Sequence, residues 1–291
     1  MQIAPLLVIV GETGSGKSAL AIELAMRLNG EIICADSWTV RREVSIGTAK
    51  PSAAEQAAVP HHLLDIVGPG EDFTAAVFKR LAIDTIDEIA ARGMLPIIVG
   101  GTGLYVDSVL YDYGFLPAGD RVDREMLNAL PIDQLLAQIR QKGLELGAID
   151  TGNKRRLIRL LETGGAVPSR RALRENSLVF GITTEREVLR NRIETRTDTM
   201  IAHGLEQETR QLVQKYGWGC EALKGIGYSQ WQDYFNGTAD KAQTRHRIVK
   251  ATMDLAKRQR TWFKRSNSIH WISTPYDFEH LVELATTNLN K

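Results

Sequence analysis

A glycine-rich loop near the N-terminus constrains the fold of this chain more than any other feature. Residues 8–25, VIVGETGSGKSALAIELA, pass from an apolar run into glycines, a lysine and a serine, and then into apolar residues at helical spacing. Residues 11–18 fit the pattern G-x-x-x-x-G-K-[ST], which joins a buried strand to the start of a helix. The sequence therefore predicts a strand over 6–10, a P-loop, and a helix over 18–28.

The chemistry of this loop suits a di- or triphosphate. Glycines let the backbone turn its N–H groups inward around phosphate oxygens, and the positive end of the helix dipole adds to the attraction. Lys17 is predicted to reach the terminal phosphate, and the Ser18 hydroxyl to bind Mg²⁺. The alternative, a glycine-rich turn without a ligand, does not explain why lysine, hydroxyl, strand and helix are all in register. The predicted diphosphate-binding residues are Gly11, Glu12, Thr13, Gly14, Ser15, Gly16, Lys17 and Ser18.

Apolar runs alternate with helical patterns along much of the chain. They predict further strands over 31–36, 62–67, 95–101 and 177–182, and a helix over 74–93 that ends at a glycine. This alternation after a P-loop predicts an α/β fold, a P-loop NTPase-like core with a mainly parallel sheet covered by helices. Ligands in such folds bind at the carboxyl ends of the strands. The segments GETGSGKS, ADS and GGTGLY follow three predicted strands, so we expect them to form one composite site.

From about Tyr111 the pattern changes to short helical segments without a convincing strand. This change predicts a helical insertion subdomain over 111–170. The insertion would separate a first part of the core, 1–110, from a second part, 171–291, that ends in basic helices.

Basic residues are concentrated in two segments, although the net charge of the chain is only +1. Residues 154–174 contain seven Lys or Arg and one acidic residue, and residues 241–265 contain nine and one. The second segment also carries Trp262 and Phe263, whose rings can stack on bases. A single basic segment is usually just the solvent-exposed face of a helix. Two such segments in a chain of near-zero net charge are harder to explain in that way. The charge pattern therefore favours a polyanionic partner, with single-stranded RNA loops offering accessible bases.

Cysteine and histidine placement gives no sign of a metal site. Cys34 and Cys220 lie far apart, which argues against a disulfide framework or a structural zinc. His61 and His62 are adjacent, so on a strand they would point to opposite faces. No apolar run approaches the ~20 residues needed to cross a bilayer, and the first predicted strand begins too early for a signal peptide. We therefore expect a soluble, cytoplasmic protein with no membrane partner.

The chain carries, in order, the motifs GETGSGKS, ADS, IGTAKPS, HHLLDIV, PIIVGGTGLYV, RRLIRLLE, RIETRTDTMIAHGLEQE, GIGYSQ and AKRQRTWFKR. Taken together, these motifs resemble one family, the tRNA dimethylallyltransferases (tRNA isopentenyltransferases, IPP transferase family), from Leu6 to about Trp271. The resemblance implies transfer of the dimethylallyl group of dimethylallyl diphosphate to N6 of the adenosine 3′-adjacent to the anticodon of tRNA, with Mg²⁺ as cofactor and release of diphosphate. It implies the tRNA anticodon stem-loop as partner, held by the helical insertion and the basic C-terminal helices, and we expect a monomer.

The resemblance also assigns roles to single residues. Asp36 matches the general base of the family, which accepts the proton of the adenine amine as the C–N bond forms; a turn-capping or Mg²⁺-binding Asp36 is the alternative. Lys17 and Arg196 match groups that stabilise the leaving diphosphate, and Thr102 matches a threonine near the adenosine. The predicted catalytic residues are thus Lys17, Asp36, Thr102 and Arg196. The predicted tRNA-binding residues are Asp36, Ser37, Trp38, Thr39, Thr102, Arg156, Arg159, Arg258 and Lys264.

Several residues depart from the family pattern, mostly where the family contacts tRNA. They are Glu12, Trp38, Thr39, Arg41, Asn153, Lys154 and Met253. Two other classes of function therefore stay open. One is a small-molecule enzyme on the same scaffold, either a P-loop kinase or a prenyltransferase acting on free adenine nucleotides. The other is a non-catalytic tRNA-binding relative.

Overall fold

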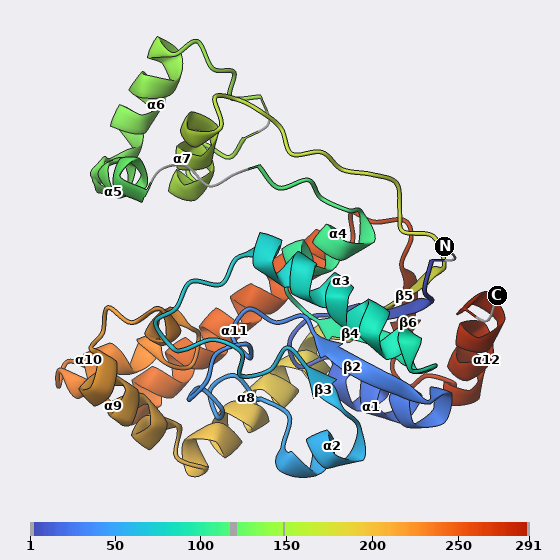
Figure 1. The fold of residues 1–291 in the computed structure, drawn as a ribbon. Helices are drawn as coiled ribbons and strands as arrows, with labels where there is room; N and C mark the ends of the chain where they lie inside the picture. Colours follow the sequence, from blue (N-terminus) through green and yellow to red (C-terminus); the bar gives the residue numbers. More distant parts are fainter. Residues whose placement is uncertain (1–2, 117–120, 148, 290–291) are drawn as a thin grey trace. The chain divides into compact units, whose positions relative to one another are not determined.

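The structure, a computed structural model, describes residues 3–116, 121–147 and 149–289 (Figure 1). It divides into two compact units: the core, Met1–Leu110 with Leu173–Lys291, and the insertion, Tyr111–Ala172. The sequence places the insertion at 111–170. The predicted regions also include residues 1–2, 117–120, 148 and 290–291, which lie outside the described residues.

The core is built on a six-stranded sheet with the order β3-β2-β4-β1-β5-β6. All pairs of neighbouring strands in the described part of the sheet are parallel, which confirms the predicted α/β architecture. Every residue of β1 is buried, as expected for a central strand covered on both faces. The strands are β1 (Leu6–Gly11), β2 (Gly30–Cys34), β3 (His61–His62), β4 (Leu95–Gly100), β5 (Ser177–Thr183) and β6 (His270–Ser273).

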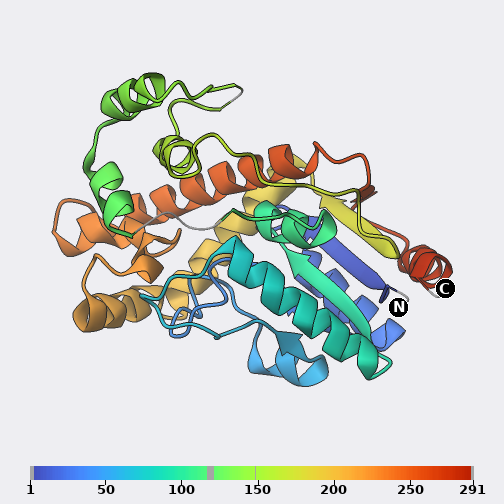
Figure 2. The same cartoon turned by 45° about the horizontal axis from the view of Figure 1, so that its top comes forward.

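Helices cover both faces of this sheet. Alternate residues of β1, Leu7 and Ile9, pack in one cluster with Leu20 of α1 and Leu281 of α12, while α3 and α4 lie on the opposite face (Figure 1). The long helix α11 packs against α4, α8 and β1 (Figure 2). The core helices are α1 (Lys17–Leu28), α2 (Ala53–Ala58), α3 (Ala75–Ala91), α4 (Gly103–Leu110), α8 (Arg186–Ala202), α9 (Leu205–Tyr216), α10 (Gln232–Phe235), α11 (Lys241–Phe263) and α12 (Phe278–Leu289), with short 3₁₀ turns at Glu221–Lys224 and Ser229–Trp231.

The insertion has a hydrophobic cluster of its own. Its helices are α5 (Arg121–Ala129), α6 (Ile132–Gln141) and α7 (Lys154–Glu162). Leu135 and Ile139 of α6 pack against Leu157 of α7. Asn153 begins α7 as an N-cap, because its side chain accepts a hydrogen bond from the N–H of Arg156 at 3.3 Å. Asn153 and the Asp expected from the family pattern are equally good N-caps, so this departure keeps the start of α7 intact.

One predicted strand was wrong, and one strand of the sheet was not predicted. In the predicted strand 62–67, only His62 pairs with β2, as part of His61–His62. Leu63 and Asp65 have φ of 61° and 54°, left-handed conformations that end a strand. Strand β6 was not predicted, because three of its four residues are exposed and it lacks an apolar pattern.

The adjacent histidines have structural partners. His62 Nε2 lies 2.6 Å from Glu31 Oε2, and His61 Nδ1 lies 2.7 Å from the carbonyl of Val59. Within the ranges that the structure describes, no group of three or more His, Cys, Asp or Glu is arranged to hold a metal ion. None of the described helices combines the length and apolar character needed to span a bilayer.

Candidate active site

The P-loop joins β1 to α1 through a turn that requires glycine. Gly14 and Gly16 have φ of 83° and 93°, conformations that side chains disfavour. A Cβ on Gly14 would also lie 3.2 Å from side-chain atoms of Leu189 and Ile193 on α8. The glycines of the motif therefore serve both the turn and the close packing of α8 against it.

Lys17 is the first residue of α1 and is partly buried, with Nζ 3.5 Å from the carbonyl oxygen of Glu12. Burial lowers its pKa to about 8, an effect that Asp36 opposes and Arg196 reinforces. Arg196 of α8 donates a hydrogen bond to Thr13 Oγ1 at 2.7 Å, and desolvation lowers its pKa as well. Two desolvated cations beside one carboxylate leave a local excess of positive charge, which favours a polyanionic ligand.

Asp36 stands just after β2 and stabilises the turn that follows. Its Oδ1 accepts hydrogen bonds from the N–H groups of Trp38 at 2.8 Å and Thr39 at 3.3 Å. The same side chain lines the central cavity. Turn capping, the alternative role of this residue, is therefore present, and it leaves the carboxylate in contact with the cavity.

Thr102, which follows β4, contacts the turn that contains Asp36. Cys34 and Val99 are paired in register on β2 and β4, so the segments after them lie side by side. The N–H of Ser37 donates to Thr102 Oγ1 at 3.1 Å. The three loops predicted to converge at the carboxyl edge of the sheet thus do so, and Thr102 holds the Asp36 turn in place.

A cavity of about 100 Å³ joins these elements. Its polar lining includes Thr13, Lys17, Ser18, Asp36 and Arg196, and its apolar lining includes Ala21, Ile32, Cys34, Ala49, Pro51 and Val99. Burial raises the pKa of the Cys34 thiol to about 12, so this cysteine is an uncharged wall residue. The lining fits a ligand with an anionic head and a small apolar group.

Helix α11, close to the end of the sequence, supplies hydrogen-bond partners for the P-loop. Gln259 Oε1 accepts a hydrogen bond from the N–H of Thr13 at 2.8 Å, and its Nε2 donates to the carbonyl of Gly101 at 3.0 Å. One side chain therefore connects the P-loop with the loop after β4. The sequence did not single out Gln259, and only its place in the motif AKRQRTWFKR could have drawn attention to it.

The next residue on α11, Arg260, binds the side chain of Glu12 in the P-loop. Its Nε donates to Glu12 Oε2 at 2.9 Å, its terminal nitrogen contacts the other Glu12 oxygen, and it also donates to the carbonyl of Thr184 at 2.7 Å. Glu12 is only 3% exposed and is absent from the cavity lining. The Glu12 side chain therefore pairs with Arg260, and binding of diphosphate by the P-loop backbone at Glu12 remains a prediction.

The residues after Asp36 have different surroundings. Thr39 is buried and lines the cavity. Trp38 is half-buried and packs beside Gly225, where an added Cβ would lie 3.2 Å from the indole ring. Arg41 is 5% exposed and donates to the carbonyls of Pro69 and Glu71, so it is structural. The tRNA contacts predicted for Trp38 and Thr39 remain predictions.

The predicted basic tRNA-binding residues fall into two groups. Arg156 on α7, Arg258 on α11 and Lys264 after α11 are exposed. Arg159 instead donates to Glu162 Oε2 at 3.2 Å and to the carbonyl of Leu116 at 2.6 Å within the insertion. The exposed residues are available to an external ligand, whereas Arg159 supports the packing of α7.

Comparisons with known proteins agree with the motifs. The model of the IPP transferase family matches residues 39–266. The tRNA dimethylallyltransferase of Pelotomaculum thermopropionicum is 39% identical over 92% of this chain and 90% of its own length. The tRNA dimethylallyltransferase 1 of Citrifermentans bemidjiense is 42% identical over 95% of this chain and 96% of its own.

Solved structures show the same likeness. A tRNA isopentenylpyrophosphate transferase from Bacillus halodurans has a TM-score of 0.76 and 37% identity, covering 98% of this chain and 95% of its own. A eukaryotic dimethylallyltransferase described as acting on tRNA has a TM-score of 0.77 and covers 99% of this chain and 77% of its own. At 24% identity, the latter supports the fold alone.

Proposed function

The chain belongs to the IPP transferase family, and from this membership we propose that it is a tRNA dimethylallyltransferase. It transfers the dimethylallyl group of dimethylallyl diphosphate to N6 of the adenosine 3′-adjacent to the anticodon. One observation carries the proposal: a single small cavity combines a P-loop with two cations, a carboxylate and an apolar wall. We also propose that the enzyme is a monomer and that it acts on tRNA in the cytoplasm.

The cavity suits each change in charge during this reaction. The N6 lone pair of adenine forms a bond to C1 of the prenyl group while the C1–O bond breaks. Asp36 takes the N6 proton, which offsets the weak nucleophilicity of an amine delocalised into the ring. Lys17, Arg196 and the P-loop N–H groups stabilise the negative charge that grows on the departing diphosphate. Thr102 keeps the Asp36 turn at the required place.

The donor set also fits Mg²⁺. The Ser18 hydroxyl lines the cavity and supplies the kind of oxygen ligand that this ion prefers. Because the described residues provide no acidic cluster there, diphosphate oxygens would have to complete its coordination, a common arrangement for Mg²⁺. The ion would add positive charge next to the leaving group.

The class of reaction is tested with labelled dimethylallyl diphosphate. We expect label to pass to bulk tRNA and not to AMP in a parallel reaction. Transfer to AMP would identify a free-nucleotide prenyltransferase. Hydrolysis of ATP without prenyl transfer would contradict the proposal in favour of a kinase, and binding of tRNA without transfer would indicate a non-catalytic relative.

The exposed basic residues at the end of α11 are expected to bind tRNA phosphates. Replacing Arg258 and Lys264 together with alanine should make tRNA binding less sensitive to salt. The slope of log affinity against log salt should become shallower by ~0.7 for each single-strand phosphate that is no longer bound. The measurement is the dissociation constant for tRNA over a series of KCl concentrations. Binding of dimethylallyl diphosphate should stay the same.

A charge-matched control is the pair Arg27→Ala and Arg80→Ala, two exposed arginines on α1 and α3. These substitutions remove the same charge from other helices and should leave the slope unchanged. Equal slopes for the two double variants would mean that the α11 residues form only a solvated face.

A further inference from the structure

Segments from three of the motifs meet at the carboxylate of Glu208, a residue to which the proposed mechanism gives no role. Glu208 lies on α9 in the segment GLEQE. The N–H groups of Ser45, Ile46 and Gly47, in the segment IGTAKPS and just before it, donate to its two oxygens at 3.0–3.1 Å. The hydroxyl of Tyr228, in the segment GIGYSQ, donates to Oε1 at 2.6 Å. A single acceptor therefore fixes three consecutive N–H groups of one loop.

The contact between Gly47 and Tyr228 is too close for any other residue at position 47. A Cβ there would lie 2.4 Å from Tyr228 Cζ, and the N–H of Gly47 also donates to the Tyr228 hydroxyl at 3.1 Å. Burial and the neighbouring Glu208 raise the pKa of Tyr228, so its hydroxyl stays protonated and donates. Glycine, tyrosine and glutamate thus form one interdependent assembly.

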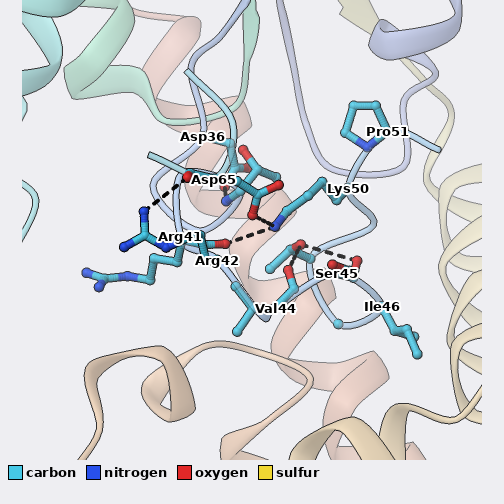
Figure 3. Close-up of polar contacts among 12 residues, drawn as sticks. Asp36, Arg41, Arg42, Val44, Ser45, Ile46, Lys50, Pro51 and Asp65 are labelled. Atoms are coloured by element: carbon cyan, nitrogen blue, oxygen red, sulfur yellow. Dashed lines mark hydrogen bonds and ion pairs between the residues drawn. The ribbon is translucent and has the colours of Figure 1, made fainter. Parts of the chain in front are cut away.

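The other side of this loop is fixed from within the core (Figure 3). We call residues 44–51 the wall loop. The ammonium of Lys50, whose side chain is 5% exposed, donates to the carbonyl of Arg41 at 2.9 Å and to Asp65 Oδ1 at 2.5 Å. Thr48 Oγ1 donates to the carbonyl of Val44 at 2.6 Å.

The wall loop forms one side of the active-site cavity. Thr48, Ala49 and Pro51 line the same cavity as the P-loop residues Lys17 and Ser18. Ala49 has φ of 50°, an uncommon conformation for alanine that persists only where the surroundings impose it. The contacts to Glu208 and Lys50 supply that constraint.

We propose that Glu208 is a positioning residue for prenyl transfer. With Tyr228 it holds the wall loop so that Thr48, Ala49 and Pro51 align the prenyl group for attack at C1. The inference rests on the proposed function, since it needs a prenyl donor in the cavity. Small misplacement of a reacting group is costly in rate, which makes such support effective.

The test compares two ligands that share a diphosphate. Glu208→Gln keeps the shape of the side chain but replaces one acceptor oxygen by an NH₂ group that faces donors. We expect it to weaken binding of dimethylallyl thiolodiphosphate, an unreactive donor analogue, by about tenfold. Binding of inorganic diphosphate, which has no prenyl group to contact the wall loop, should not change. Calorimetric titration of both ligands below the melting temperature gives the two dissociation constants.

Glu206→Gln is the matched control, because Glu206 lies on the same helix and pairs with Arg210 and Lys241 instead of the wall loop. It should leave both dissociation constants unchanged. Tyr228→Phe removes one donor to Glu208 and should show a smaller loss in the same direction. It carries the test if Glu208→Gln does not fold.

Equal weakening of both ligands would mean general damage to the core, and no weakening of either would mean that the wall loop does not need Glu208. Both results would overturn the inference. Prenyl transfer by the unsubstituted enzyme is measured alongside. Its absence would contradict the proposed function instead, so the two failures are distinguishable.

Discussion

Asp36→Asn is expected to lower kcat for prenyl transfer by about 10²–10⁴-fold, the usual effect of losing a positioned general base. Asparagine keeps the carbonyl oxygen that accepts from Trp38 and Thr39, so the turn after β2 should persist. It cannot take the N6 proton, however. Single-turnover transfer with both substrates saturating measures the chemical step, and a binding assay on the same tRNA measures affinity.

Asp84→Asn provides a control of the same chemistry on the exposed face of α3, and we expect it to be silent. A fall of less than about tenfold for Asp36→Asn would show that Asp36 is not the base. A collapse of tRNA affinity with little loss in rate would make it an anchor for the adenosine.

Lys17→Ala is the second substitution with a large expected effect. The lysine lies in the P-loop and lines the same cavity as Arg196, so we expect it to contact the diphosphate both before and during departure. Its loss should weaken binding of dimethylallyl diphosphate and slow transfer together, by about 10²-fold or more in kcat/KM. Retained transfer with lost ATP binding would show that the loop serves a nucleotide instead.

The same lysine predicts a pH dependence. Burial lowers its pKa from 10.5 to about 8, so the free enzyme loses this positive charge as the pH rises above about 8. Affinity for dimethylallyl diphosphate should therefore fall toward tenfold per pH unit above that value, since the bound diphosphate requires the charged form. Titrations between about pH 6.5 and about pH 9.5 test this, and Lys17→Ala should flatten the profile.

The stability of the unliganded protein should change in the opposite direction. The unfolded chain holds the Lys17 proton up to about pH 10.5, whereas the folded chain releases it near 8. Between these values the unfolded state binds more protons, so the contribution of Lys17 to stability improves with rising pH. A melting series with and without diphosphate separates this effect from ligand binding.

Local sequence was sufficient for the P-loop, because glycine spacing, lysine and helix pattern all lie within one short segment. The sheet topology was sufficient to predict that Asp36 and Thr102 lie close together, since parallel strands bring their carboxyl ends to one edge of the sheet. Both predictions depended on the buried strands β1, β2 and β4, whose apolar runs are unambiguous.

The remaining parts of the site depend on contacts that no short segment encodes. Gln259 and Arg260 occur in a basic helix, and nothing in that pattern distinguishes them from Arg258, which is exposed. Burial against the P-loop decides their role. The same holds for Glu208, whose partners lie in two other segments. The predicted strand 62–67 failed because left-handed residues interrupt an apolar run that otherwise suits a strand.

The link between α11 and the P-loop has a consequence for synthesis on the ribosome. Residues 11–18 emerge early, yet Thr13 N–H and the Glu12 carboxylate receive their partners only from Gln259 and Arg260. Until those residues have been translated, the Thr13 N–H and the Glu12 carboxylate lack the partners that hold them in the folded loop. The P-loop therefore lacks its α11 contacts while most of the chain is being translated. We therefore expect a chain that stops before α11 to bind diphosphate more weakly than the full chain.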